Sequence, residues 1–432
     1  MKSLQALVLL LLSSAIFFVE AQEDSCNTLS VGETVAVDPS GSIHLVGRSL
    51  LDQDDPNSVS VFHAQYNRSG VRTAFSYLPL DEDIKVKDVE VTPAGSVYLV
   101  GHTNASLAAN SAGNQDVVLA QYRDGEPVWL DQFGTSGEDV VWALDIAEDG
   151  KIYIAGTTEG SLTQPVSGDN DQFVVAYSES GERLWVSQLS FSVEGSDFPT
   201  AVTADSDGNV YLTGNFSEKP IEENVPVGIN IFTARLDETA SELWRRELAG
   251  AMFDLSRAIY ADDEFVLIAG NTSNRLDEDV YNNEQDEPGQ SIDGLMAAYN
   301  PSGDLVWLKQ FGYFHSYSGE IVTRLSTGEV ILISKGNDDI GGPEIGASDI
   351  TLQLYSSGGD ELWAAKLGTA SFDEPRAVTV DESDAVYLTG FIKQEWNTSY
   401  ERELRQFGCE TFLAKYDSTG QLQWFDSFDA AP

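Results

Sequence analysis

One phrase recurs seven times along the chain, and it constrains the fold more than any other feature. The clearest copies occupy residues 35–47, 89–101, 144–156 and 202–214, and each ends in a Gly. Weaker copies occupy residues 259–270, 322–336 and 378–390, at spacings of roughly 54 to 64 residues. Each copy consists of two short alternating apolar runs around a tight polar turn. That pattern is typical of a β-hairpin.

A second phrase follows each copy and predicts a second hairpin. This second phrase is recognised by a Trp four residues after its turn Gly; these residues are Trp129, Trp185, Trp307, Trp363 and Trp424. Trp244 holds the same place in a copy whose turn lacks Gly. Because six of the 8 tryptophans share one repeat position, we interpret them as structural residues.

Four short strands per repeat, seven times over, predict an all-β chain: one domain, folded as a seven-bladed β-propeller of four-stranded antiparallel blades. The phrases resemble the SBBP-type propeller repeat, in which an apolar-Y-x-x-x-G-x-x-x-W segment is followed by I-A-V-D-x-x-G-N-V-Y-V-T-G. The resemblance spans about residues 33 to 428 and is closest at 202–214 and 378–390. It implies a propeller but transfers no catalytic residues, because propellers host many activities. The expected blades are residues 33–79, 87–134, 141–190, 199–249, 256–312, 320–368 and 375–428.

The resemblance also implies a strand order in which the first hairpin of each unit is the inner one. Both chain ends then meet at one blade junction, without a blade shared between the termini. The two cysteines, Cys26 and Cys409, lie near this junction. An isolated pair in an oxidising compartment is most simply one disulfide, so we expect a Cys26–Cys409 bond to close the ring.

The first 21 residues predict a secretory signal peptide, with Lys2 ahead of an apolar run and a small residue, Ala21, at the cleavage site. The remaining residues, 22–432, are then a soluble, secreted, extracellular domain. Five sequons predict N-glycosylation if the source is eukaryotic; they are Asn67, Asn104, Asn215, Asn271 and Asn397.

The chain carries 24 Lys plus Arg against 70 Asp plus Glu, a formal net charge of −46. A polyanion of this size repels phosphate backbones and anionic lipid, which argues against nucleic-acid binding and membrane attachment. Much of this charge is expected to be a solvating coat on a secreted β-protein.

The connections between the two hairpins of a blade are long and should emerge on one face, where binding usually resides. The most acidic of them contains Asp277, Asp279, Glu284 and Asp286. Such oxygen ligands make Ca²⁺ chemically reasonable, although the spacing is not that of an EF-hand and a solvated acidic loop is the alternative. No other cofactor is indicated.

Two further patterns are candidates for a site near the mouth of the central channel. A carboxylate recurs 10 or 11 residues before the first-hairpin turn, at Asp139, Asp197, Asp254 and Asp373. It is either a partial ring of acids or a repeated cap on the turn between blades, and its recurrence favours the cap. An aromatic link without counterpart elsewhere contains His315 and Tyr317, the weak candidates for catalysis. A buried aromatic cluster is the alternative.

These observations predict a binding or scaffold module, monomeric, whose long-loop face recognises an extracellular protein or glycan. The alternatives are an extracellular carbohydrate-active hydrolase or lyase with a site at the channel mouth, and a matrix- or mineral-associated structural polyanion.

Overall fold

The computed structural model describes residues 28–50, 59–80, 83–108, 112–192, 194–217, 228–248, 253–273, 276, 292–312, 317–337, 340–343, 345–346, 348–395 and 407–430. These residues form strands and turns, without a helix that is long and apolar enough to cross a membrane. The strands fall into seven antiparallel groups of four, which confirms the predicted seven-bladed propeller.

The strands of the first four blades are β1 (Thr28–Val37), β2 (Ile43–Leu50), β3 (Val59–Tyr66), β4 (Arg72–Tyr77); β5 (Lys85–Val91), β6 (Val97–Thr103), β7 (Asp116–Arg123), β8 (Glu126–Phe133); β9 (Asp139–Ile146), β10 (Ile152–Thr158), β11 (Asp171–Tyr177), β12 (Arg183–Leu189); β13 (Asp197–Ala204), β14 (Val210–Ser217), β15 (Ile229–Leu236) and β16 (Glu242–Leu248). The strands of the last three blades are β17 (Asp254–Ala261), β18 (Val266–Thr272), β19 (Asp293–Tyr299), β20 (Leu305–Phe311); β21 (Tyr317–Arg324), β22 (Val330–Gly336), β23 (Asp349–Tyr355), β24 (Glu361–Leu367); β25 (Asp373–Val380), β26 (Val386–Glu395), β27 (Phe407–Tyr416) and β28 (Leu422–Phe428).

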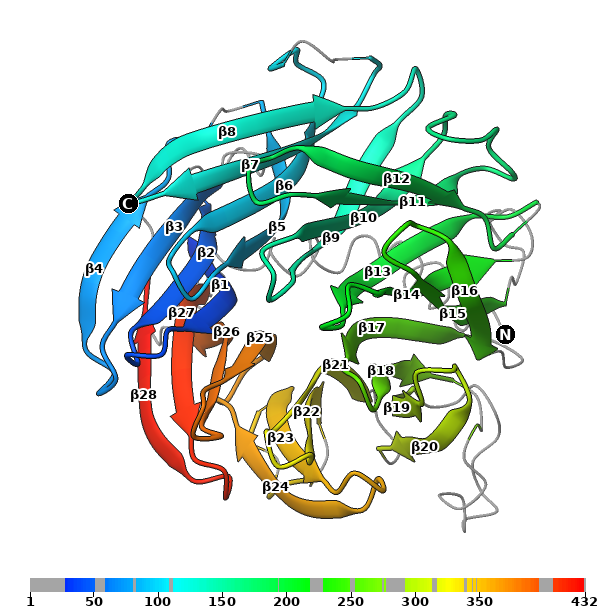
Figure 1. Ribbon diagram of the computed structural model, residues 1–432. Helices are drawn as coiled ribbons and strands as arrows, with labels where there is room; N and C mark the ends of the chain where they lie inside the picture. The colour runs from blue at the N-terminus through cyan, green and yellow to red at the C-terminus, as the bar shows by residue number, and fades with distance from the viewer. Residues whose placement is uncertain are drawn as a thin grey trace, which may run out of the picture.

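The first strand of every blade lies nearest the propeller axis and the fourth strand lies at the outer rim (Figure 1). The first strands contact one another in a closed ring, from β1 to β5 and onward to β25, which returns to β1. The second and third strands are buried nearly throughout. Their near-continuous apolar runs therefore form the core between neighbouring blades, as expected for sheets covered on both faces.

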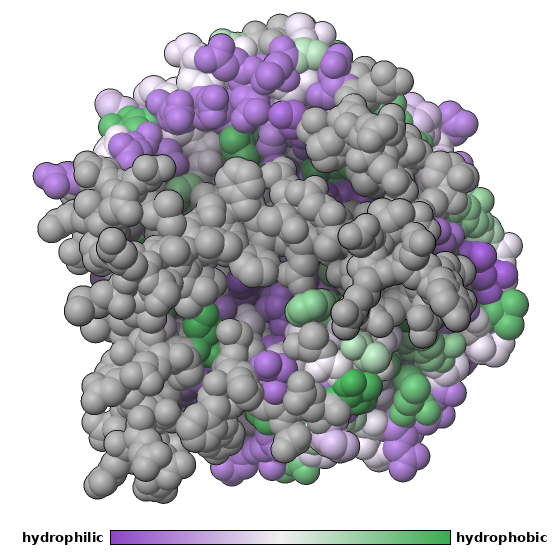
Figure 2. Space-filling view, turned by 180° about the vertical axis from the view of Figure 1, so that it is seen from behind, coloured by the Kyte–Doolittle hydropathy of each residue, from purple (hydrophilic) through white to green (hydrophobic). Residues whose placement is uncertain are grey.

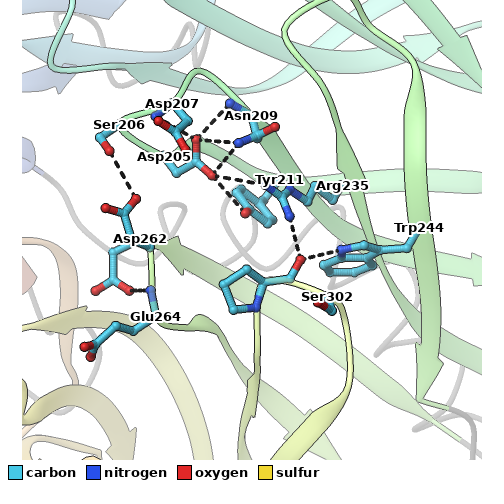
Figure 3. A network of polar contacts seen from close by, with 12 residues as sticks. Asp205, Ser206, Asp207, Asn209, Tyr211, Arg235, Trp244, Asp262, Glu264 and Ser302 are labelled. Carbon is cyan, nitrogen blue, oxygen red and sulfur yellow. Dashed lines mark hydrogen bonds and ion pairs between the residues drawn. The ribbon is translucent and has the colours of Figure 1, made fainter.

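The repeated tryptophans lie at the junctions between blades. The indole N–H of Trp244 donates to the carbonyl oxygen of Pro301, in the outer turn of the next blade, at 2.9 Å (Figure 3). Trp129 and Trp307 make the same bond to the next blade, to Glu179 and Ser357. The indoles of Trp363 and Trp424 make no such hydrogen bond but lie against Gly420 and Gly70, in the outer turns of the next blades. Five of the six repeated tryptophans therefore pack on the neighbouring blade, in agreement with a structural role.

The ring closes at the junction between blades 7 and 1. As expected, all four strands of blade 7 come from the C-terminal part of the chain. However, β1 begins earlier than the repeat suggested, and Thr28 and Leu29 pair in parallel with Gly408 and Cys409 of β27. Single parallel bridges occupy the same place at three other junctions; they are Gln115–Glu138, Ile229–Phe253 and Ser348–Phe372. Backbone pairing thus closes the ring, which the sequence had assigned to a disulfide alone.

The C-terminal segment strengthens the same junction. The hydroxyl of Tyr77 in blade 1 donates to the carbonyl of Ala430, and the hydroxyl of Ser30 donates to the carbonyl of Phe428 at 3.3 Å. Cys409 is buried in β27. Cys26 lies outside the described residues, so the Cys26–Cys409 bond stays a prediction.

Candidate functional site: two rings of residues around the propeller axis

Each of the seven first strands carries a β-bulge at the same point of its pairing with the second strand. A bulge leaves one residue out of the ladder and re-aims its side chain. The residues left out are Glu33, Lys87, Trp142, Thr200, Arg257, Glu320 and Arg376, which we call the bulge ring. All seven are half-buried. The core position two residues later is apolar in every blade, whereas this position holds acids, bases, a hydroxyl and an indole.

A second set of residues lies beside the bulge ring, on the second strands. The residue just before each bulge pairs with the Gly that ends the repeated phrase, or with Ser334 in blade 6. The next residue along each second strand forms the partner ring: Arg48, His102, Thr157, Asn215, Asn271, Lys335 and Phe391. Both rings lie near the ends of the second strands, where the long connections begin. On the face seen in Figure 2, hydrophilic side chains are visible among the described residues near the middle.

An arc of alternating charges runs through blades 6, 7 and 1. Nζ of Lys335 lies 3.5 Å from Glu320 and 3.3 Å from Glu374 of the next blade. Arg376 lies 3.4 Å from the same Glu374. These alternating positive and negative side chains, together with those of blade 1, connect the three blades around the axis.

Blade 1 continues this arc. Nε of Arg48 donates to Oε1 of Glu33 at 2.8 Å. Although burial opposes ionisation, the charges of Arg48 and Arg376 hold the pKa of Glu33 below its usual range. In the same way, Lys335 and Arg257 lower the pKa of Glu320 to about 2 against the effect of burial. Both carboxyl groups are therefore ionised at neutral pH.

Blades 2 and 3 contribute an aromatic part of the bulge ring. Nζ of Lys87 lies 5.3 Å from the centroid of the Trp142 ring, which is cation–π distance. The Trp142 N–H donates to the hydroxyl of Thr157 at 3.2 Å. Burial lowers the pKa of the neighbouring His102 to about 4, and Lys87 acts in the same direction. His102 is therefore a neutral residue and no acid–base group at neutral pH.

Uncharged polar residues fill the rings at blades 4 and 5. The hydroxyls of Thr200 and Ser256 are 2.8 Å apart, and the backbone N–H of Ser256 donates to the Asn215 side chain at 2.9 Å. Nδ2 of Asn271 donates to the hydroxyl of Ser318 at 3.3 Å. These contacts connect one blade to the next and leave Arg257 as the only charged member of both rings in blades 4 and 5.

A carboxyl cluster lies further along the first strands, on blades 2 and 3. Burial raises the pKa of Asp88 to about 7, the pKa of Asp145 to about 6, and, together with the nearby Asp88 charge, the pKa of Glu90 to about 8. The backbone N–H groups of Val89 and Leu144 donate to the two oxygens of Asp88 at 2.8 and 2.9 Å. Thr34 donates to Glu90 at 2.7 Å. Each carboxyl thus connects neighbouring first strands while carrying a proton over part of the neutral range.

Three of the four recurring aspartates are caps. All four begin a first strand, β9, β13, β17 or β25, and their side chains are buried. Asp139 accepts from the backbone N–H of Thr135 at 2.5 Å, Asp373 from that of Thr369 at 2.5 Å, and Asp197 from that of Phe191 at 2.7 Å. Asp254 accepts from the hydroxyl of Thr272 at 2.5 Å, and residues 249–252 before it lie outside the described part of the chain. The structural interpretation is therefore correct for the first three, and all four carboxyl groups are engaged in hydrogen bonds.

Most of the other predicted site residues lie elsewhere. Asp277, Asp279, Glu284, Asp286, His315 and Asn397 lie outside the described residues. Tyr317 begins β21 and is buried in the core, where its ring packs edge-on against Phe311 and its hydroxyl accepts from Ser334 at 3.1 Å. In the described part of the chain, no group of three or more His, Cys, Asp or Glu is placed to hold a metal ion.

The described sequons divide into two kinds. Asn67 and Asn104 are exposed. Asn215 and Asn271 are buried members of the partner ring, at 8% and 9% exposure, and their amides are hydrogen-bonded. A glycan on either would displace the next blade, so we expect these two sequons to stay unmodified, and glycosylation of all five remains a prediction.

Sequence reasoning missed both rings. A signal for the partner ring was present in six of the seven copies, because aligning these phrases on their terminal Gly shows one variable position directly after it. The bulge itself gave no signal, because the residue left out is defined only by the register of the partner strand.

Comparison with known proteins supports the fold. The SBBP family, described as a beta-propeller repeat, matches residues 184–215. A search of curated proteins found no significant match. Among solved structures, puromycin hydrolase matches with a TM-score of 0.53 at 12% identity, over 94% of this chain and 55% of that one.

Two other structures are less similar. A puromycin-hydrolyzing peptidase of Mycobacterium tuberculosis matches with a TM-score of 0.48 at 13% identity, over 94% of this chain and 53% of that one. The α-L-arabinanase of Penicillium chrysogenum matches with a TM-score of 0.44 at 9% identity, over 77% and 95%. The chain spans about half the length of the peptidases it matches, and at these identities the likeness shows the fold alone. The protein is a seven-bladed β-propeller containing a segment that matches the SBBP β-propeller repeat.

Proposed function

We propose that the protein is a secreted, extracellular binding module whose ligand docks on the bulge ring and the partner ring. The observation that carries this proposal is the loss of repeat symmetry at these fourteen positions, close to core positions of the same strands that stay apolar in every blade. The residues two positions after each bulge are an example; they are Val35, Val89, Leu144, Val202, Ile259, Val322 and Val378. A purely structural position in a repeat tends to hold one residue type, as the capping aspartates do. Varied polar and aromatic side chains gathered at one place on a rigid scaffold are typical of a recognition site.

A binding screen against immobilised glycans and secreted proteins, with and without Ca²⁺, tests the proposal. Trp142→Ala should abolish the binding that the wild type shows, because it removes the only aromatic member of the bulge ring. Leu243→Ala, on the exposed outer strand β16, is the matched control and should keep it. Binding that is lost in the outer variant and kept in the Trp142 variant would place recognition on the rim and contradict the proposal.

The Ca²⁺ arm of the screen tests the acidic loop. Asp277, Asp279, Glu284 and Asp286 have the oxygen chemistry for calcium, and we keep Ca²⁺ at this loop as a proposal. If the protein were instead a matrix polyanion, calcium would bind at many weak sites and binding would fall steeply with salt.

One observation favours a hydrolase as the second candidate. Glu33 is held ionised while burial raises the pKa of the neighbouring Asp88 to about 7, and such a separation is the pattern of an acid–base pair. Existing contacts argue against the hydrolase. Both oxygens of Asp88 already accept backbone hydrogen bonds, and Glu33 is bound by Arg48. Turnover of a chromogenic glycoside that disappears in both Glu33→Gln and Asp88→Asn would support the hydrolase over the binding module.

A further inference from the structure

The two rings hold five cationic side chains, and four of them have partners. Arg48 binds Glu33, Lys335 lies between Glu320 and Glu374, Arg376 binds Glu374, and Lys87 lies over Trp142. Five of the 24 Lys and Arg residues of a chain with net charge −46 thus lie at fourteen positions. Positive charge is concentrated at the axis of an acidic protein.

Arg257 is the fifth cation, and it differs from the others. Within the described residues its guanidinium makes no hydrogen bond or ion pair, whereas Arg376, whose Nε is likewise buried without an acceptor, has an ion pair with Glu374. Its electrostatic neighbour is Glu320, whose carboxylate is 3.5 Å from Lys335. A guanidinium has five N–H donors, and leaving buried donors unsatisfied is costly. The two terminal nitrogens of Arg257 are not among the buried unpaired atoms, so they are open to an acceptor from outside the chain.

The fork of a guanidinium matches the two oxygens of a carboxylate, which it binds with two parallel hydrogen bonds. The ligand group at Arg257 is therefore an oxyanion. A polyanionic ligand is a poor partner, because its other negative groups would lie outside the rings and be repelled by a protein of net charge −46. A ligand with one acidic group avoids most of that repulsion.

Other members of the bulge ring indicate what carries the acid. Thr200 lies on the preceding blade, where its hydroxyl is 2.8 Å from that of Ser256, the residue before Arg257, and Trp142 supplies an indole two blades before Arg257. Hydroxyl groups match sugar hydroxyls, and aromatic faces accept the apolar face of a sugar ring, so a ligand that reaches from Arg257 to Trp142 would have to span two blades. Because the proposed ligand site contains all of these, we infer that Arg257 binds the carboxylate of an acidic sugar residue. This inference rests on the proposed function of the rings.

Isothermal calorimetry with galacturonate, galactose and the C-terminal acid of a dipeptide tests the inference. The wild type should bind galacturonate more tightly than galactose. Arg257→Gln should weaken galacturonate binding about ten- to a hundredfold, the usual effect of losing a charged hydrogen-bonding partner, and should weaken galactose binding much less. Arg257→Lys should recover part of the loss, because the charge stays while the fork is lost.

Arg123→Gln is the control for charge. Arg123 is exposed at the outer rim and pairs with Glu179 at 3.3 Å, so its loss changes the net charge equally without touching the rings. Thermal unfolding of each variant checks the fold. If Arg257→Gln unfolds, Arg257→Lys and a neutral amide of galacturonate give the same comparison in a folded protein.

Three outcomes overturn the inference. Equal binding of galacturonate and galactose, or galacturonate binding that survives Arg257→Gln, removes the carboxylate contact. If the dipeptide binds and the two sugars do not, the ligand of Arg257 is a peptide C-terminus and not an acidic sugar. If Trp142→Ala abolishes galactose binding while Arg257→Gln has no effect on any ligand, the proposed function stands and only the role of Arg257 fails. The absence of binding to all three probes counts against the inference, whereas the proposed function is judged on the broader screen.

Discussion

The indole of Trp424, in the last blade, lies against the backbone of Gly70, in the first. A Cβ on Gly70 would be 2.7 Å from Cδ2 of Trp424. The same contact joins Trp129 to Gly181 and Trp244 to Gly303. In each of these three contacts the Trp packs against the turn Gly of the next blade, and not against the Gly of its own repeat. The junction between the two chain ends uses the same packing as the internal junctions.

Substitution at Gly70 measures this contact. Gly70→Ala should lower the free energy of unfolding by about 2–4 kcal/mol, through the strain of a left-handed backbone and the overlap with Trp424. Gly125→Ala is the matched control, because Gly125 has nearly the same φ, 82° against 79°, but its Cβ would meet nothing closer than 4.0 Å. It should cost about 1 kcal/mol from strain alone. Equal losses in chemical denaturation would show that the indole contact contributes nothing.

Stability should fall as the pH rises from about 5 to 8. The pKa of Glu90 is raised to about 8 in the folded protein, so between its unfolded value of 4.5 and 8 the folded state holds more protons than the unfolded state. Raising the pH through this window therefore removes stability, by up to about 1.4 kcal/mol per pH unit for one proton. Asp88 and Asp145 act in the same direction.

Glu90→Gln isolates one group of this cluster. The amide keeps an oxygen to accept from Thr34 but does not titrate. Relative to the wild type, the variant should gain stability steadily between pH 5 and 8 in denaturant titrations, while the general repulsion among acids cancels in the difference. A constant difference across this range would contradict the raised pKa. Glu320 acts with the opposite sign, since its pKa is lowered to about 2 and its contribution is lost only as the pH falls below 4.5.

A thiol titration tests the predicted bond between Cys26 and Cys409. The unfolded, unreduced protein should show no reactive thiol, and reduction should release two. Because β1 and β27 already pair at Thr28–Gly408 and Leu29–Cys409, the reduced protein should keep its fold and lose stability only. Two reactive thiols before reduction would refute the bond.

Glycan occupancy should follow exposure. After expression in eukaryotic cells, Asn67→Gln and Asn104→Gln should each remove one glycan mass with little change in melting temperature. Asn215→Gln and Asn271→Gln should leave the mass of the attached glycans unchanged and lower the melting temperature, because they disturb buried hydrogen bonds to Ser256 and Ser318. Intact-protein mass spectrometry with thermal unfolding separates the two patterns. A glycan found on Asn271 would mean that blades 5 and 6 pack differently.

The fold could be predicted because each hairpin is encoded locally, by alternation on both sides of a polar turn, and because the phrase recurs seven times. The capping role of Asp139 followed from the same recurrence. The site could not be predicted in this way. Glu33 of blade 1 and Arg376 of blade 7 are brought together by closing the ring, and nothing within one repeat records which residue of the next blade it will meet. The burial of Asn215 could not be predicted for a related reason, since a sequon is defined by three residues and burial depends on the neighbouring blade.

Each first strand pairs with its neighbour in the sheet and also supplies one residue of the bulge ring, and the bulge keeps these two roles separate. A bulged residue is absent from the hydrogen-bond ladder, so Trp142 or Arg257 can be exchanged without shifting the register that holds each blade together. Seven such positions, independent of one another in the backbone, make the propeller axis a surface whose chemistry can change residue by residue. New specificities could accordingly arise by single substitutions, with no insertion and no new loop.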